Sequence, residues 1–569
     1  MNLRIFLPLL LLVSSALAAP PSRPDFGPNV EIFDPSMPSA SIQKQIDAVY
    51  AIQQHNEFGP QRNAFLFLPG NYSVDVPVGF YTEVIGLGAS PDATRITGNF
   101  HADANEKKNN ATTTFWRAAE GLSVTPTGGV MQWAVSQAIS LRRMHIRGDL
   151  VLHQHRGWAS GGWLSDSLID GNVDSGSQQQ WISRNCNWRS WTGSNWNMVF
   201  VGVDHPPDGQ WPEPPYTTVA QTPIVREKPF LQVNAAGEFN VRVPSLRTDS
   251  SGITWQGGET PGESIPLAHF YIAHPDVDTA DTINAQLASG KHLLLTPGIY
   301  NLTAPIHVTR PHTIVLGIGY ATLRPTKGTA AMTTADVDGI EIAGLLFDAG
   351  PTESLVLLEI GPAGSHAQHS ADPISLHDVF FRVGGAGPGR TKSNLTINSN
   401  HTLVDHTWNW RADHGDAVGW NLNTSANGLI VNGNDVTIYG LFVEHHQQFQ
   451  VLWNGNRGRT YFYQSEIPYD PPSQPAYTSA QGTNGWASYK VADNVTNHEA
   501  WGLGIYSVFI RPHVDLTRAI EVPNRPDVRF HHIITVALGH NGAITHVIND
   551  RGESTAIRPR VTPKINTYP

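Results

Sequence analysis

Hydrophobic positions recur in short runs along the chain, and two long segments repeat one order of elements. Apolar residues with helical spacing at 42–50 are followed by FLFLPGNY at 65–72 and by VIGLG at 84–88. The same order returns at 283–300, which ends in HLLLTPGIY, and continues with VLGIG at 315–319. Each half of the chain is therefore predicted to open with a short helix, an apolar strand, a Pro-Gly turn and a further strand.

After each opening, short apolar or β-branched runs are separated by Asn, Asp and Gly, as in DGIEIAGLLFDAG at 338–350 and NGLIVNGNDVTIYGLFVEHH at 427–446. The repeat is about one coil of a parallel β-helix, in which side chains point alternately inward and outward. Asn at the corners can form hydrogen-bonded ladders along such a stack. The sequence predicts an all-β fold of two tandem right-handed parallel β-helix domains packed side by side, with the leading helices covering their ends. A β-sandwich is the alternative, but it would show hairpin signals instead of a duplicated opening.

The chain divides into four predicted parts. Residues 1–18 combine Arg4 with an apolar run and end in Ala-Leu-Ala, which is typical of a secretory signal peptide and indicates a secreted, extracellular protein. We expect a first β-helix domain at 19–203, a Pro-rich linker with a strand pair at 204–270 and a second β-helix domain at 271–569. Because the linker is long, the two solenoids are expected to pack together and to leave a cleft between them. No later run of about 18 apolar residues suggests a membrane span.

Charge and aromatic content limit the classes of molecule that the protein is expected to bind. A net charge of −11 without a basic tract disfavours nucleic acid and acidic polysaccharides alike. Charged residues make up only 15% of the chain while 16 residues are Trp, so exposed aromatic rings could stack on a neutral polysaccharide. The His pairs at 445–446 and 531–532 are adjacent residues that point to opposite sides of a strand, and no phosphate-binding loop or G-x-S-x-G elbow occurs. We therefore expect a monomer that uses no metal and no cofactor.

The chain has one cysteine and seven candidate glycosylation sequons. Cys186 is the only cysteine, so no intrachain disulfide can form, and we expect it to be buried. Candidate glycosylation sequons begin at Asn71, Asn110, Asn301, Asn394, Asn400, Asn423 and Asn494.

Four sequence blocks in the second half resemble those of a known protein family. Two segments in the first half resemble it less closely. The blocks are WNWRADHGDA at 408–417, VEHHQQFQVLWNGNR at 443–457, YQSEIPYDPPS at 463–473 and the run from AIEVPNRPD to THVIND at 519–550, and the first-half segments are SQQQWISRNCN at 177–187 and REKPFL at 226–231. The chain resembles family 55 of the glycoside hydrolases, exo- and endo-β-1,3-glucanases built from two pectin-lyase-like β-helices joined side by side. Its opening, NVEIFDPSMPSASIQ at 29–43, departs from the family's usual start.

The two glutamates of the EHH and QSEIPY motifs are separated by about one β-helix coil, so both side chains can emerge from adjacent coils on one face. Hydrolysis of a glycosidic bond needs a carboxylic acid to protonate the leaving oxygen. Glu466 is the candidate acid, because Tyr463, Pro468 and Tyr469 are placed to desolvate it and raise its pKa. The alternative is a glutamate that only closes the turn before Pro468.

The resemblance implies that Glu444 helps to hold the attacking water of an inverting reaction, together with a first-domain glutamine that matches Gln179 or Gln180. Glu444 could instead hold His445 or His446 in place. Further candidates for binding sugar or positioning water are Trp410, His414, His445, His446, Gln464 and Tyr469, and Asp413 and Asp416 are additional acidic candidates.

The function predicted is a secreted glycoside hydrolase that cleaves β-1,3-glucan of the laminarin type by inversion. One alternative is an enzyme acting on another polysaccharide, either a different β-glucan or a uronate cleaved by a lyase. A lyase would need basic residues at its cleft, and the blocks at 408–473 are neutral and aromatic in character. The other alternative is a non-catalytic glycan-binding protein of the cell wall.

Overall fold

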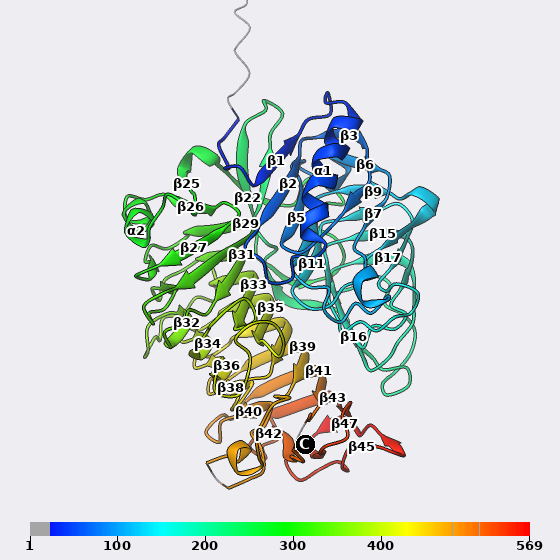
Figure 1. The fold of residues 1–569 in the computed structure, drawn as a ribbon, viewed down its shortest axis with the longest axis vertical. Coiled ribbons are helices and arrows are strands. Elements are labelled where there is room, and N and C mark those ends of the chain that lie inside the picture. The colour runs from blue at the N-terminus through cyan, green and yellow to red at the C-terminus, as the bar shows by residue number, and fades with distance from the viewer. Residues whose placement is uncertain (1–22, 481, 511) are drawn as a thin grey trace, which may run out of the picture.

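The computed structural model describes residues 23–480, 482–510 and 512–569. The expected signal peptide at 1–18 lies outside these residues. The described chain is almost entirely β structure, and two stacks of strands stand side by side, the first blue to cyan and the second green to red (Figure 1). Within the described residues no helix is long and apolar enough to cross a membrane.

A short α-helix opens each stack, as the hydrophobic pattern predicted. Helix α1 (Ser39–Gln53) buries Ile42 and Ile46, and helix α2 (Ala280–Ala288) buries Ile283 and Leu287. In each helix the two buried residues are four positions apart and so share one face, which packs into the core of its own stack. The predicted opening helices are confirmed.

The described first half forms two large parallel sheets and one parallel pair, β4 (Val76–Pro77) with β7 (Phe100–His101). Its longer sheet follows the order of the chain, with β1 (Val30–Phe33), β2 (Asn63–Phe67), β5 (Thr82–Gly86), β8 (Arg117–Glu120), β11 (Ile139–Arg142), β14 (Trp163–Ser165), β16 (Gln180–Arg184), β18 (Asn197–Val201) and β19 (Tyr216–Val219). The other sheet contains β3 (Gly70–Ser73), β6 (Thr94–Thr97), β9 (Ser123–Thr125), β12 (His145–Ile146), β15 (Leu168–Asp174), β13 (Asp149–Val151) and β10 (Val130–Gln132), with β17 (Asn187–Thr192) beside β15.

The second half repeats this plan with longer strands. One sheet contains β25 (Phe270–Ala273), β26 (His292–Leu295), β29 (Ile314–Pro325), β31 (Glu341–Asp348), β33 (Ser375–Val383), β35 (Leu403–Arg411), β37 (Thr437–Glu444), β39 (Gly458–Glu466), β41 (His498–Ser507) and β43 (Val528–Ala537), with β27 (Ile299–Leu302) beside β29 and the antiparallel β47 (Lys564–Tyr568) at its end. The other contains β28 (Ile306–Val308), β30 (Met332–Thr334), β32 (Ser354–Ile360), β34 (Thr391–Ile397), β36 (Ser425–Val431), β38 (Val451–Trp453), β40 (Tyr489–Val491), β42 (Leu516–Glu521) and β44 (Ile544–Ile548).

Asparagines at the corners of the second stack hydrogen-bond from one layer to the next. The Asn432 Nδ2 donates to Asn398 Oδ1 at 2.8 Å, and the Asn454 Nδ2 donates to Asn432 Oδ1 at 2.8 Å. These bonds satisfy the side-chain amides and fix the spacing of successive layers. The predicted asparagine ladder is confirmed.

The duplication is also visible in how the two Pro-Gly-x-Tyr turns are stabilised. The Tyr72 hydroxyl donates to the carbonyls of Leu68 and Phe33, and the Tyr300 hydroxyl donates to those of Thr296 and Ala273. In both halves the tyrosine hydroxyl thus lies within hydrogen-bond distance of the carbonyl four residues back and of the carbonyl that ends the first strand of its stack, β1 or β25. Each phenol is buried, so the hydrogen bonds offset the cost of removing its hydroxyl from water.

The segment between the stacks is antiparallel. Strand β20 (Thr222–Val225) pairs with β23 (Arg247–Ser250), while β21 (Phe230–Val233), β22 (Phe239–Pro244) and β24 (Gly262–Pro266) form a small sheet. Strand β19 still pairs with β18, so the first parallel sheet continues beyond residue 203. The division into domains at 203 and 270 stays a prediction.

An aromatic layer joins the two stacks. Trp116 of the first half lies 5.0 Å from Trp408 of the second, measured between ring centroids, and 6.2 Å from Phe380. These rings belong to one buried cluster that also includes Trp163 and Phe442. Because large aromatic side chains remove much apolar surface from water, this layer contributes strongly to holding the halves together.

Buried ion pairs cross the same boundary. The Arg142 guanidinium contacts both carboxylate oxygens of Asp378, at 2.8 and 2.9 Å, and Asp405 at 2.7 Å. Asp405 is also contacted by Arg184, which in turn binds Glu227. Attraction to the two arginines holds the pKa of Asp405 well below its usual range, even though burial raises it.

Arg142→Met should therefore lower the free energy of unfolding by about 3–5 kcal/mol, since Asp378 and Asp405 would remain buried with one cation fewer. Denaturant unfolding at pH 7 measures this loss. The control is Arg457→Met, which breaks an exposed pair with Asp435 and should cost less than about 1 kcal/mol. Equal losses in the two variants would refute a special role for the buried network.

The structure separates the candidate glycosylation sequons into two groups. Asn394, Asn400 and Asn423 are buried, so a glycan cannot be accommodated on them in the folded protein, whereas Asn71 and Asn301 are exposed. Asn110 and Asn494 are also at least partly accessible. Cys186 is fully buried, as predicted.

Candidate active site

A cavity of about 270 Å³ opens between the two stacks and brings both halves of the chain together. It is lined by Thr112, Thr113, Phe115, Gln137, Ser160 and Gln179 of the first half, and by Trp410, Asp413, His414, Glu444, His445, Glu466, Tyr469 and Leu538 of the second. Of the twelve candidate residues named from the sequence, eight line this cavity: Gln179, Trp410, Asp413, His414, Glu444, His445, Glu466 and Tyr469.

The strand order of the two stacks explains why these side chains meet. Gln137, Ser160 and Gln179 each stand just before one of β11, β14 and β16, which are successive neighbours in the first sheet. Glu444 and Glu466 are the last residues of β37 and β39, neighbours in the second sheet. The amino ends of three first-half strands therefore face the carboxyl ends of second-half strands across the cavity.

Glu444 and Glu466 are direct register partners on adjacent parallel strands, so their side chains leave the sheet on the same face. Their exposed fractions are only 3% and 9%. Burial raises the pKa of Glu466 to about 7, and burial together with the nearby Glu466 charge raises the pKa of Glu444 well above its usual range. Two carboxylates so close and so dry favour a state in which the pair holds one proton at neutral pH.

The hydrogen-bond partners decide which member carries that proton. Glu444 accepts from the Gln137 amide at 2.9 Å and from the Trp408 indole N–H at 2.9 Å, one to each oxygen. The indole can only donate, and the Gln137 Nε2 also donates to the Ser160 carbonyl at 3.2 Å, so both contacts stabilise an ionised Glu444. Glu466 instead contacts the Tyr469 hydroxyl, which can accept as well as donate. This contrast favours the proton on Glu466, although burial and the Glu466 charge also raise the pKa of Glu444.

His414 links the two halves at the rim of the cavity. Its Nε2 lies 2.6 Å from Glu57 of the first half, and its Nδ1 lies 2.9 Å from Asp413. Although desolvation opposes the charge, these two carboxylates raise the pKa of His414 to about 9, so the imidazolium persists at neutral pH. The resulting bridge fixes the loop that places Asp413 and Trp410 at the cavity.

Glu57→Gln is expected to raise the KM for a glucan substrate about fivefold with little change in kcat, since one charge-assisted contact to the loop is lost.

The raised pKa of His414 contributes stability that is present below about pH 6.5 and is lost as pH rises through about 9. The variant should therefore lower Tm at pH 6 and have little effect at pH 10. Asp550→Asn, which changes an exposed partner of Arg518, is the control. An equal loss of Tm at both pH values would contradict the role of the His414 charge.

The adjacent histidines point to opposite sides. His445 lines the cavity, and its ring packs against Tyr469 at 4.4 Å between centroids. His446 is turned into the protein, where its ring nitrogens lie 2.8 Å from Ser425 Oγ and 3.1 Å from the Asn409 carbonyl. The expectation that His446 contacts sugar is corrected, because its ring is turned into the protein and both ring nitrogens already contact protein atoms.

The glutamines separate in the same way. Gln179 lines the cavity, whereas Gln180 is fully buried and donates to the Ser160 carbonyl. Of Gln179 and Gln180, only Gln179 is placed to contact a ligand in the cavity. Gln464 also lies outside the lining, and its amide is 3.4 Å from Glu466 Oε1. Gln464 therefore supports the carboxylate pair from behind and does not bind the substrate directly.

Aromatic residues form part of the cavity wall. Trp410 is only 1% exposed and stacks on Trp408 at 4.7 Å, so it presents an edge to the cavity and not an open face. Phe115 of the first half lies 5.6 Å from Trp410 and also lines the cavity. Sugar would therefore meet an apolar wall contributed by both halves.

Sequence patterns did not identify several of the residues that contact the site. Gln137, Ser160 and Glu57 of the first half contact the site but stand in no motif that marks it, and Trp408, although it opens the 408–417 block, was not named as a site residue. The acidic candidate Asp416 lies outside the cavity lining. Among the described residues no group of three or more His, Cys, Asp or Glu is arranged to hold a metal ion.

Two buried glutamates on adjacent strands, facing a polar cleft on a parallel β scaffold, supply the carboxyl groups that a glycoside hydrolase needs. Residues 270–466 match the LAM55 pectate lyase-like domain. The chain is 46% identical over 548 residues to the exo-β-1,3-glucanase of Streptomyces sp. strain SirexAA-E, covering 96% of this chain and 90% of that enzyme. It therefore belongs to glycoside hydrolase family 55, the family that its motifs resemble, and is a glycoside hydrolase.

Solved structures agree with this placement. The structure of sacteLam55A from Streptomyces sp. SirexAA-E matches with a TM-score of 0.94 and 45% identity, covering 96% of this chain and 99% of that one. A variant of sacteLam55A in complex with glucose matches with the same TM-score and coverage.

Proposed function

We propose that this protein is a secreted exo-acting β-1,3-glucanase that releases glucose from laminarin-type chains with inversion. Support for the substrate comes from the exo-β-1,3-glucanase that it matches over nearly its whole length and from the glucose complex of its structural relative. The single observation that carries the mechanism is the contrast between the two glutamates. Glu444 accepts from two N–H donors, while Glu466 contacts the Tyr469 hydroxyl, which donates to its Oε2 and can rotate to accept a hydrogen bond from a protonated Glu466.

In this mechanism Glu466 donates its proton to the glycosidic oxygen as the bond to the anomeric carbon breaks. A water held by the ionised Glu444 and by first-half polar groups attacks the anomeric carbon from the opposite face and passes its proton toward Glu444. Gln179 and Ser160, which line the same cavity, are proposed to help to orient that water. The low exposure of the site strengthens each of these electrostatic interactions.

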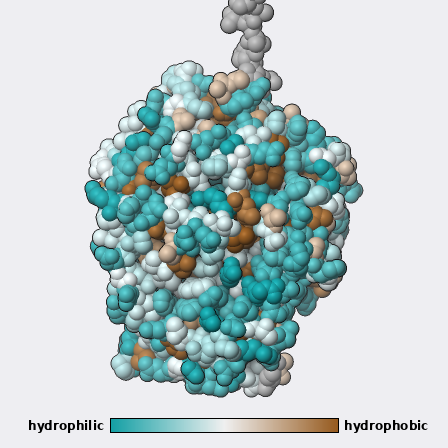
Figure 2. Space-filling model, turned by 180° about the vertical axis from the view of Figure 1, so that it is seen from behind, coloured by the Kyte–Doolittle hydropathy of each residue, from teal (hydrophilic) through white to brown (hydrophobic). Residues whose placement is uncertain are grey.

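We further propose that the two stacks are tandem right-handed β-helices, with domains at 19–203 and 271–569 joined by 204–270, and that the mature protein is an extracellular monomer. The in-order parallel pairing of strands within each long sheet supports the helical description. On the face shown in Figure 2, hydrophobic residues form small groups separated by hydrophilic ones, which favours a monomer.

Digestion of a panel of defined glucans tests the proposed substrate. Laminarin and β-1,3-linked oligosaccharides should release glucose from the first minutes, whereas β-1,4-linked glucan and uronate polymers should not be cleaved. A ladder of oligosaccharides as the first products would contradict exo attack. Cleavage of β-1,4-linked glucan alone would contradict the substrate.

A further inference from the structure

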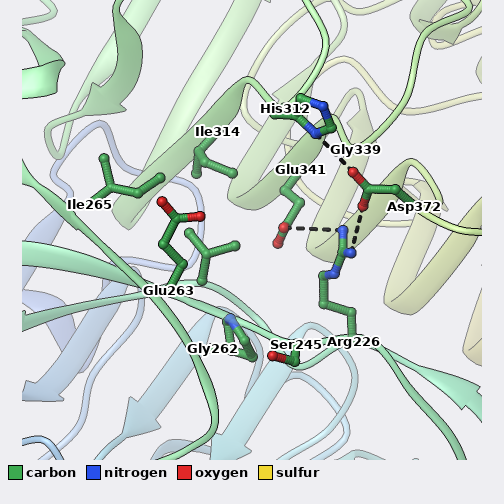
Figure 3. Close-up of a pocket in the computed structure, with 12 residues that line it drawn as sticks. Arg226, Ser245, Gly262, Glu263, Ile265, His312, Ile314, Gly339, Glu341 and Asp372 are labelled. Carbon is green, nitrogen blue, oxygen red and sulfur yellow. Dashed lines mark hydrogen bonds and ion pairs between the residues drawn. The ribbon is translucent and has the colours of Figure 1, made fainter.

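A second cavity, of about 300 Å³, lies where the connecting segment packs on the second stack. Strands β22 and β24 supply Val243 and Ile265, β29 supplies Ile314, and the first residue of β31 supplies Glu341 (Figure 3). None of its lining residues lines the catalytic cavity. It is therefore a separate site with its own chemistry.

Three carboxylates line this cavity against one guanidinium. Arg226 lies 3.3 Å from Glu341 Oε1 and 2.6 Å from Asp372 Oδ1, and the other oxygen of Asp372 lies 2.8 Å from His312 Nδ1. Glu263 makes no ion pair with any residue that the structure describes, and Figure 3 shows its carboxylate facing the same space as that of Glu341. Both oxygens of Asp372 are thus paired, whereas the Glu263 carboxylate and one oxygen of Glu341 can accept a hydrogen bond from a ligand.

Glu341 is the unusual member of the group. Its side chain is 2% exposed, and its Oε2 has no hydrogen-bond partner among the described residues. His377 lies on the neighbouring strand β33. Its Nε2 is 4.0 Å from Glu341 Oε2, which is too far for a hydrogen bond. Burial raises the pKa of Glu341 to about 8, the Arg226 charge lowers it and the Asp372 charge raises it. A buried acceptor left without a donor costs free energy that a ligand N–H would recover.

We propose that this cavity binds a primary alkylammonium group, which donates to Glu341 Oε2 and Glu263 while its hydrocarbon part packs on Ile265 and Ile314. The charges favour a cation, since ionised Glu341, Glu263 and Asp372 outnumber Arg226. No aromatic side chain is among the lining residues, so a sugar ring would find no stacking surface. An anion would face the same carboxylates and is excluded by repulsion.

Binding is coupled to the loss of the Glu341 proton. An alkylammonium ion keeps its charge up to about pH 10, as lysine does. Below pH 8 the carboxyl group must first release its proton, so the affinity should rise about tenfold per pH unit and level off above pH 8.

The test uses n-butylammonium chloride as the probe and n-butanol as its neutral analogue, with calorimetry and ligand-observed NMR on the full chain at pH 6.5 and 8.5 and constant ionic strength. We expect binding of n-butylammonium that strengthens at least tenfold between the two pH values, and no binding of n-butanol. Glu341→Gln keeps the shape of the side chain and should weaken binding more than tenfold without changing laminarin hydrolysis.

Glu263→Gln, at an exposed position that does not threaten folding, should weaken binding by a smaller factor. Asp493→Asn, at an exposed carboxylate outside this cavity, is the matched control and should change nothing. Equal binding of n-butanol, pH-independent binding, unchanged binding in both glutamate variants or no binding of the probe would each overturn the proposal.

Discussion

Glu466→Gln is expected to lower kcat on laminarin by about 10²–10⁴-fold, because the amide keeps the shape of the side chain but cannot deliver a proton to the glycosidic oxygen. KM should change little, since the Tyr469 hydroxyl can still hydrogen-bond the amide. Steady-state kinetics with matched thermal unfolding measure both effects. Glu521→Gln, at a partly exposed glutamate paired with Lys490, is the control and should retain full activity.

The pH profile supplies an independent check on the same residue. Burial raises the pKa of Glu466 to about 7, so the protonated acid is present below that pH and is lost above it. The wild-type kcat should therefore fall as pH rises through about 7. If Glu466→Gln kept most of its kcat, or if kcat were constant from pH 6 to 8.5, Glu466 would not be the acid.

Glu444→Gln is expected to lower kcat by about 10²-fold or more, through the loss of the negative charge that holds the attacking water. The new amide N–H₂ must also face either Gln137 or Trp408, both of which donate, so the side chain should shift. Gln137→Ala removes one donor without changing the charge and should cost less activity. A Glu444→Gln variant whose defect is confined to Tm would indicate a purely structural glutamate.

Much of the scaffold could be predicted from local patterns. Helical spacing identified Ile42 with Ile46 and Ile283 with Leu287, and the recurring asparagines predicted the ladder that Asn398, Asn432 and Asn454 form. The coil-length separation of the two glutamates predicted that they would leave neighbouring strands on one face. These features depend on periodicity within a single stack, which a sequence displays directly.

The remainder of the site depends on how the two stacks pack. Gln137 and Ser160 meet Glu444 only because the ends of first-half strands face those of the second half, and no spacing along the chain encodes that contact. The misassignment of His446 has a different cause. His445 and His446 lie beyond the end of β37, and His445 has a left-handed backbone (φ 67°), so the direction of each ring depends on this local turn and on the contacts of His446 with Ser425 and Asn409.

The anomeric configuration of the first product tests the central claim most directly. If Glu466 acts as the acid and Glu444 only holds water, the reaction passes through a single displacement and inverts the anomeric carbon. Proton NMR of the anomeric signals during the first minutes of laminarin digestion, sampled faster than mutarotation, should therefore show α-glucose before β-glucose. The appearance of β-glucose first would require a covalent glycosyl-enzyme and would contradict the account.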